Sequence, residues 1–125
     1  MADIGHLAQA PAGRRFVRPL GDLDLASAPR LGLALLSAGR RPETTVVLDL
    51  SRVAFMDCAA LGELLRVRDA LGGRLALCGV PSPVALLLRL TELTTEFPVV
   101  AVDPARVPSP RPGTPLTPER ETNVA

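Results

Sequence analysis

Residues 44–50 read TTVVLDL, a run of β-branched and other apolar residues with almost no interruption. Such a run is typical of a central strand that is covered on both faces in a parallel sheet. Residues 53–56 then lead into Asp57, a residue type that caps helix N-termini, and apolar periodicity predicts a helix over 58–71. The Gly-Gly pair at 72–73 ends this helix. The centre of the chain therefore predicts a buried strand followed by an amphipathic helix.

The predicted helix over 58–71 has an apolar side and a polar side. Its spacing places four leucines toward the core and three charged residues toward solvent. The inward residues are Leu61, Leu64, Leu65 and Leu71, and the outward ones are Glu63, Arg66 and Asp69.

Further elements follow on both sides of this centre. Upstream, residues 16–20 predict a strand that ends at Gly21, and Ser27 is placed to cap a helix that ends at Gly39. That helix has Pro29 in its first turn and one apolar face made of Leu31, Ala34, Leu35 and Ala38. The remaining predicted elements are an edge strand over 4–8, a strand over 74–78, a helix over 82–90 and a last short strand over 98–102. Strands thus alternate with helices, which predicts an α/β sandwich with a central, mostly parallel sheet of four to five strands and helices packed against it.

The chain of 125 residues is long enough for one domain and too short for two ordinary ones. We expect the folded domain to occupy residues 14–103, after an N-terminal segment over 1–13. Residues 104–125 contain six prolines and almost no large apolar side chains, so this segment is expected to be a disordered tail.

Composition excludes several classes of function. Fourteen basic residues, all arginine, face 13 acidic ones, and a net charge of +1 gives no general attraction to nucleic acid or to an anionic membrane. The longest apolar stretch, 84–88, is far shorter than the roughly 20 residues that cross a bilayer. The N-terminus has no export signal and the two cysteines suit a reducing compartment, so we expect a cytoplasmic protein without a membrane segment.

Two short segments are the candidate binding site. Residues 21–24 (GDLD) and 57–61 (DCAAL) both follow predicted strands, and ligands and partners of such sheets bind outside the carboxyl ends of the strands. We therefore expect Asp24 and Asp57 to be neighbours. The alternative interpretation is that each aspartate only forms a turn or caps a helix. The sequence offers no further residues that would complete a metal site.

Other reactive residue types carry little signal. His6 has no motif partner and is expected to be an exposed bystander rather than a catalytic base. Cys58 lies at a predicted helix start, where a reactive thiol is one interpretation, but its residue type favours a small buried side chain. Cys78 lies within an apolar strand and is expected in the core. Because no GxSxG, HExxH or phosphate-loop pattern is present, the sequence predicts no enzyme and no cofactor.

Several motifs in order carry a resemblance to a known family. They are GDLDLASAP at 21–29, VVLDLSRVAFMDCAALGELL at 46–65, the glycine pair, RLALCGV at 74–80, a helix that starts with Ser-Pro, and TTEFPVV at 94–100. Together they resemble the STAS domain of anti-sigma factor antagonists over residues 14–103. The resemblance implies a small α/β domain that is not an enzyme and that docks onto an anti-sigma factor, usually one with a kinase-like ATPase fold. Docking releases the sigma factor, so transcription proceeds.

The resemblance also implies a site and a departure from the usual regulation. In the family, an Asp-Ser-Ser/Thr-Gly-Leu motif carries the hydroxyl whose phosphorylation blocks docking, and here the motif reads DCAAL, with Ala59 at the acceptor position and Ala60 in place of glycine. An alanine methyl cannot accept a phosphoryl group, so phosphorylation control is expected to be absent. Glu92 stands where the family often has glycine. The implied partner-binding residues are Asp22, Asp24, Asp57, Cys58, Ala59 and Ala60.

The sequence leaves two functions open besides this one. The protein is alternatively a STAS scaffold or ligand-sensing module that assembles with similar domains or with a second copy of itself. An enzyme comes third, because the chain shows no catalytic constellation.

Overall fold

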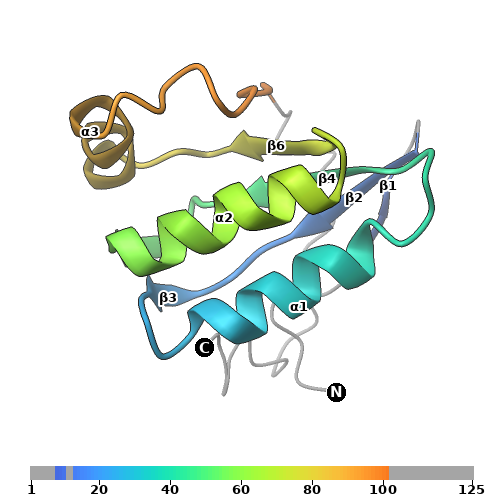
Figure 1. The fold of residues 1–125 in the computed structure, drawn as a ribbon, viewed down its shortest axis with the longest axis horizontal. Helices are drawn as coiled ribbons and strands as arrows, with labels where there is room; N and C mark the ends of the chain where they lie inside the picture. Colours follow the sequence, from blue (N-terminus) through green and yellow to red (C-terminus); the bar gives the residue numbers. More distant parts are fainter. Residues whose placement is uncertain (1–7, 11–12, 102–125) are drawn as a thin grey trace.

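A computed structural model describes residues 8–10 and 13–101 of the chain. It contains one main sheet, a smaller second sheet, and three helices (Figure 1). The elements in chain order are β1 (Ala8–Ala10), β2 (Arg14–Val17), β3 (Gly21–Leu23), α1 (Ala28–Ala38), β4 (Thr45–Asp49), β5 (Val53–Met56), α2 (Cys58–Ala70), β6 (Leu75–Cys78) and α3 (Ser82–Leu90). The predicted α/β sandwich with a mostly parallel sheet is confirmed.

The main sheet has the strand order β1-β2-β4-β6. Strand β4 lies in the centre and pairs in parallel with β2 and β6, and β1 is an antiparallel edge. Val46, Val47 and Leu48 of β4 are completely buried, as expected for a strand covered on both faces. The second sheet pairs β3 and β5 in parallel.

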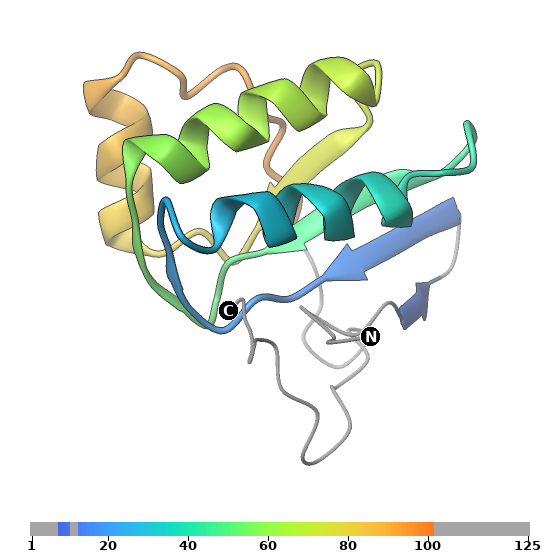
Figure 2. The ribbon, with the colours of Figure 1, turned by 60° about the horizontal axis from the view of Figure 1, so that its bottom comes forward.

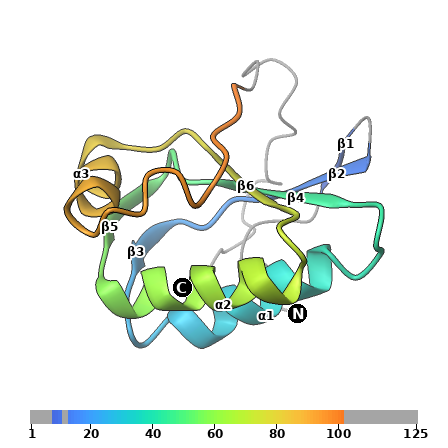
Figure 3. The same cartoon turned by 45° about the horizontal axis from the view of Figure 1, so that its top comes forward.

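Helices α1 and α2 lie next to each other on one face of the main sheet (Figures 2 and 3). The predicted inward residues Leu61, Leu64 and Leu71 are buried there, and Leu65 is partly buried. Glu63 departs from the expectation that it faces solvent, because its side chain is only 15% exposed. It lies against Gly32 of α1, where a side chain would collide with the Glu63 carboxylate, and that carboxylate pairs with Arg66.

A second, smaller cluster lies on the other side of the sheet. Phe16, Val47 and Cys78 are buried there, and Val100 packs against them. Cys78 therefore takes the core position that its sequence context predicts. Burial is the main cause that raises the pKa of its thiol to about 11, and the nearby Asp49 adds to the effect.

Three strand predictions need correction. The strand predicted over 16–20 is β2, Arg14–Val17, because Pro19 has no N–H to donate and restricts the residue before it. Gly21–Leu23, expected to be a strand end and turn, forms β3 and pairs with β5. The strand predicted over 98–102 is reduced to one bridge between Leu77 and Val99 in the described residues.

Some predictions fall wholly or partly outside the residues that the structure describes. These are His6, most of the edge strand expected over 4–8, and the tail over 104–125. The described edge strand is β1, Ala8–Ala10. Within the described part of the chain, no helix has the length and apolar character needed to cross a membrane.

Candidate functional site

Asp57 is the structural centre of the candidate site. Its backbone is extended, and its Oδ1 accepts a hydrogen bond from the Ala60 N–H at 2.9 Å, so it caps α2 as the sequence predicts. Its Oδ2 accepts a second hydrogen bond, from the Leu25 N–H in the β3–α1 loop at 3.2 Å. The Asp57 N–H in turn donates to the Leu23 carbonyl oxygen at 3.0 Å. One residue thus joins the start of α2 to the β3–α1 loop.

The β3–α1 loop is held by a reciprocal turn between Asp24 and Ser27. The Ser27 N–H donates to Asp24 Oδ1 at 3.1 Å, and the Asp24 N–H donates to Ser27 Oγ at 3.0 Å. The Ser27 hydroxyl also lies 3.2 Å from the Asp22 carbonyl oxygen. Ser27 takes the N-cap position of α1 as expected, but its side chain makes no capping hydrogen bond. Its hydroxyl points back into the loop, since its own backbone is already helical.

The predicted neighbourhood of the two aspartate segments is confirmed by these bonds. The hydrogen bond from Leu25 to Asp57 brings the residue after Asp24 against the start of α2, 32 positions further along the chain. The same bonds also bear out the alternative interpretation in part, because Asp24 forms a turn and Asp57 caps a helix. The two carboxylates therefore shape the surface as well as lying on it.

The accessible part of the site differs from the expected set at Ala60 and Leu25, and the burial favoured for Cys58 is wrong. Cys58, for which a buried side chain was favoured, is exposed, because its position in the first turn of α2 faces away from the core. Ala60 is completely buried, so its methyl group lies in the core beneath the site. Leu25 was missed. It is 75% exposed between the aspartates, and an apolar residue inside an acidic turn was the signal for it.

The site has the chemistry of a contact surface. Exposed Asp22, half-buried Asp24 and Asp57, and the exposed Leu25 give an acidic surface around one apolar side chain. Among the described residues, no group of three or more histidine, cysteine, aspartate or glutamate side chains is placed to hold a metal ion.

Glu92, the other departure from the family pattern, lies just after α3. Its φ of 59° is the left-handed conformation that glycine adopts most easily. The Leu93 N–H still donates to the Leu88 carbonyl oxygen at 2.8 Å, which is the bond of a left-handed helix end. The helix end therefore keeps the glycine-type geometry with a glutamate in place.

Residues 8–103 match the family model described as the STAS domain, and the chain therefore belongs to the STAS domain family. Solved structures with the same fold include an anti-sigma factor antagonist from Mycobacterium paratuberculosis, with 23% identity, a TM-score of 0.68, and coverage of 78% of this chain and 84% of that one.

Two further solved structures share the fold. A protein of Thermotoga maritima assigned as an anti-sigma factor antagonist has 16% identity and a TM-score of 0.68, over 82% of this chain and 92% of that one. The Bacillus cell fate determinant SpoIIAA in its phosphorylated form has 19% identity and a TM-score of 0.56, over 80% of this chain and 94% of that one. None of the curated proteins matches the chain. At these identities the likeness to the solved structures concerns the fold.

Proposed function

We propose that this protein is an anti-sigma factor antagonist that regulates transcription by binding an anti-sigma factor. Its docking surface comprises Asp22, Asp24, Leu25, Asp57, Cys58 and Ala59. The observation that carries the proposal is the pair of hydrogen bonds through which Asp57 holds the β3–α1 loop against the start of α2. The membership of the STAS family and the fold shared with anti-sigma factor antagonists support it.

The docking surface is ordered before a partner arrives. Asp57 fixes the start of α2, and the Asp24–Ser27 turn fixes the loop beside it, so little backbone freedom is lost on binding. Leu25 presents its side chain from this fixed loop, and an exposed apolar residue with a polar surround has the arrangement of an interface core and rim. The three carboxylates favour a partner surface with positive charge.

Docking is proposed to proceed without phosphorylation control. Ala59 lies in the first turn of α2 at the family's acceptor position and carries no hydroxyl group. A phosphoryl group there would add nearly two negative charges beside Asp57, and its absence leaves the surface in one charge state. The protein performs no catalysis in this proposal, and its partner is an anti-sigma factor with a kinase-like ATPase fold.

The test is calorimetric titration of the purified protein against each kinase-like anti-sigma factor of the organism that makes it. We expect one of them to bind, and to release its sigma factor when it does. Leu25→Asp should weaken binding at least about tenfold, because the interface would then bury an unpaired carboxylate.

Val99→Asp is the matched control. Val99 is 62% exposed and lies beside β6, away from the docking surface, so this variant should bind like the wild type. Thermal midpoints of both variants establish that each is folded. The proposal is wrong if no anti-sigma factor binds, or if the two variants bind equally. Binding to another STAS protein in place of an anti-sigma factor would identify the alternative, a scaffold module.

A further inference from the structure

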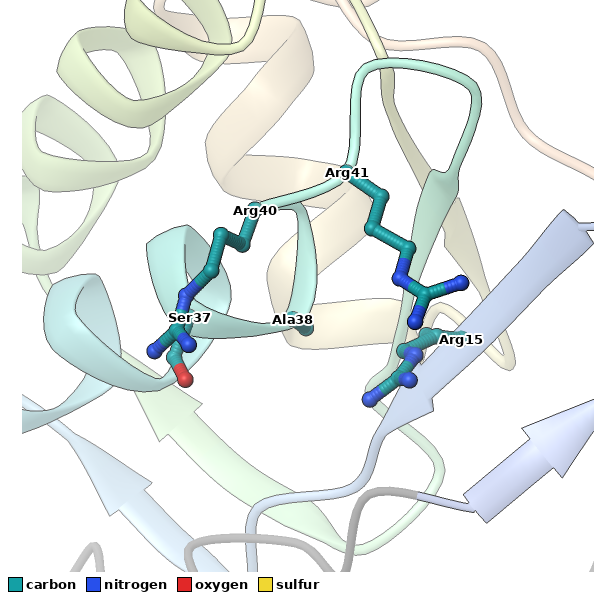
Figure 4. A pocket seen from close by; sticks show the side chains of 5 residues that line it. All are labelled: Arg15, Ser37, Ala38, Arg40 and Arg41. Carbon is teal, nitrogen blue, oxygen red and sulfur yellow. The ribbon is translucent and has the colours of Figure 1, made fainter.

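A cavity of about 230 Å³ lies at the C-terminal end of α1, at the far end of that helix from the docking surface. Figure 4 shows the side chains that line it. Arg15 comes from β2, and the others come from the last turn of α1 and the loop after it: Ser37, Ala38, Arg40 and Arg41. Arg15 and Arg41 extend to one side of the cavity, and Arg40 extends to the other side together with Ser37.

The loop that carries Arg40 and Arg41 is held by hydrogen bonds from a fourth arginine, Arg74. The Arg74 Nη1 donates to the carbonyl oxygens of Arg41 at 3.0 Å and of Thr44 at 2.6 Å, and its Nη2 donates to that of Gly39 at 3.1 Å. Carbonyl groups at a helix C-terminus carry partial negative charge, which would oppose an anion. Arg74 offsets this charge with its own and holds the loop through these hydrogen bonds.

The three arginines of the cavity are not neutralised by carboxylates in the described residues. The arginines of that part of the chain that form ion pairs with carboxylates are Arg18, Arg66 and Arg68 instead. Glu43, the acidic residue of the same loop, is exposed. Like charges that share a small space repel one another, and a bound anion converts that repulsion into attraction. The cavity therefore has the electrostatics of an anion site.

We propose that this cavity binds a phosphate-type oxyanion with several negative charges, of which pyrophosphate is the simplest. Arginine guanidinium groups donate two parallel hydrogen bonds to such oxygens, and the Ser37 hydroxyl adds another donor. The volume is below the roughly 300–1,000 Å³ of sites for drug-sized molecules, which favours a small group. The lining contains no aromatic side chain on which a base could stack.

This site is separate from the proposed docking surface. Helix α1 has 11 residues, which corresponds to about 16 Å between its ends at 1.5 Å per residue. The proposed anion site therefore does not depend on the proposed anti-sigma factor binding, and each is tested separately.

The test is calorimetric titration of the full chain with sodium pyrophosphate at constant ionic strength. We expect saturable binding at one site and at least a tenfold loss of affinity in the double variant Arg40→Gln/Arg41→Gln. The matched control is Arg52→Gln/Arg89→Gln, which removes two exposed arginines from other parts of the surface. It should keep the wild-type affinity. Thermal midpoints without ligand confirm that both double variants fold.

Parallel titrations with orthophosphate and with ADP identify the source of the anion. If ADP binds as tightly as pyrophosphate and loses affinity in the same variant, the site holds the diphosphate end of a larger molecule. If only pyrophosphate and orthophosphate bind and lose affinity in this variant, the ligand is a free oxyanion. Either of these two results supports the site. Equal losses in the two double variants would reduce the effect to overall charge and overturn the proposal, as would no saturable binding to the wild type.

Discussion

Asp57 uses each of its carboxylate oxygens on a different backbone N–H group. One belongs to its own helix, at Ala60, and the other to Leu25, 32 positions earlier in the chain. The first bond is a local helix cap, which is worth about 1 kcal/mol in typical helices. The second ties the β3–α1 loop to the start of α2, next to the point where β3 pairs with β5. A single side chain is therefore both a stabilising cap and the tether that shapes the surface around Leu25.

At the neighbouring position, Ala59→Ser is expected to create a phosphorylation switch. The wild-type protein should bind a kinase-like partner equally well with or without prior incubation with ATP, because Ala59 has no hydroxyl group. The serine variant should gain one phosphoryl group and then bind more weakly, since the new charge lies beside Asp57. Intact mass and binding affinity after kinase treatment measure both effects.

The control for this switch is the wild type treated in the same way. Phosphate found on wild-type Ser51, Ser82 or another hydroxyl, together with a loss of binding, would contradict a protein without phosphorylation control.

Alkaline stability is expected to depend on Cys78. The chain has no tyrosine and no lysine, the residue types that would otherwise titrate at alkaline pH alongside this thiol. Burial, with Asp49 nearby, raises the pKa of the Cys78 thiol from 9.0 to about 11. The folded state thus holds this proton more tightly than the unfolded state, so the stabilisation is complete below pH 9 and is lost as the pH rises toward 11.

Chemical denaturation at pH 8 and pH 11 measures this dependence. The wild type and Cys58→Ser should both lose unfolding free energy, on the order of 1–2 kcal/mol, over this range. Cys78→Ala should lose much less, although it is less stable at both pH values. The same pH dependence in Cys78→Ala would contradict the assignment.

At the scale of the elements, the three helices differ in the residues that begin and end them. Helix α2 begins with a capping side chain at Asp57, whereas α1 and α3 begin with proline in the first turn and no side-chain cap bond. Proline suits a first turn because its missing N–H would have no helical partner there. At the other end of α3, Glu92 takes a left-handed conformation that costs free energy for any residue with a Cβ atom.

Glu92→Gly is therefore expected to stabilise the protein. Glycine adopts the φ of 59° at no steric cost, and the gain in unfolding free energy should be up to about 1 kcal/mol. Denaturant unfolding monitored by circular dichroism measures it. Glu96→Gly, at an exposed position without positive φ, is the comparison and should not stabilise. A loss of stability in Glu92→Gly would show that the glutamate side chain contributes more than its backbone conformation costs.

The whole molecule is held by one main core that joins both sheets and all three helices. Its completely buried members come from elements along most of the described chain, and they include Val17, Leu35, Leu48, Leu64 and Leu75. The last core residue before the tail is Phe97, which is 2% exposed. The family match ends shortly after it, at residue 103.

Removal of residues 104–125 is expected to leave the fold and its stability unchanged. These residues are rich in proline and poor in large apolar side chains, so they add little to a core. The thermal midpoint of a chain that ends at Asp103 should therefore lie within about 5 °C of the full-length value, and scanning calorimetry measures this.

A chain that ends at Glu96 is the control for this truncation. It lacks Phe97 and the segment that bonds to Leu77 of β6. Its thermal midpoint should therefore fall by more than about 5 °C. If the chain that ends at Asp103 is destabilised as much as the chain that ends at Glu96, the domain boundary at residue 103 is wrong.

The sequence by itself determined the elements whose signals are local. The central strand, the Asp57 cap, the two sides of α2 and the alternation of strands with helices all follow from periodicity and capping, which act over a few residues. The position of the two aspartate segments after predicted strands also indicated that they lie close together. Cys78 was expected in the core for the same local reason, an apolar strand around it.

Tertiary structure alone decided the features that depend on distant partners. Gly21–Leu23 becomes a strand because β5 supplies its hydrogen-bonding edge, and residues 98–101 keep only one bridge. Glu63 is largely covered because Gly32 of another helix leaves space for it. Leu25 lies beside Asp57, and Arg15 lines the same cavity as Arg41, only because elements far apart in the chain pack together. Local patterns specify which element forms, but contacts between elements specify which side chains share a surface.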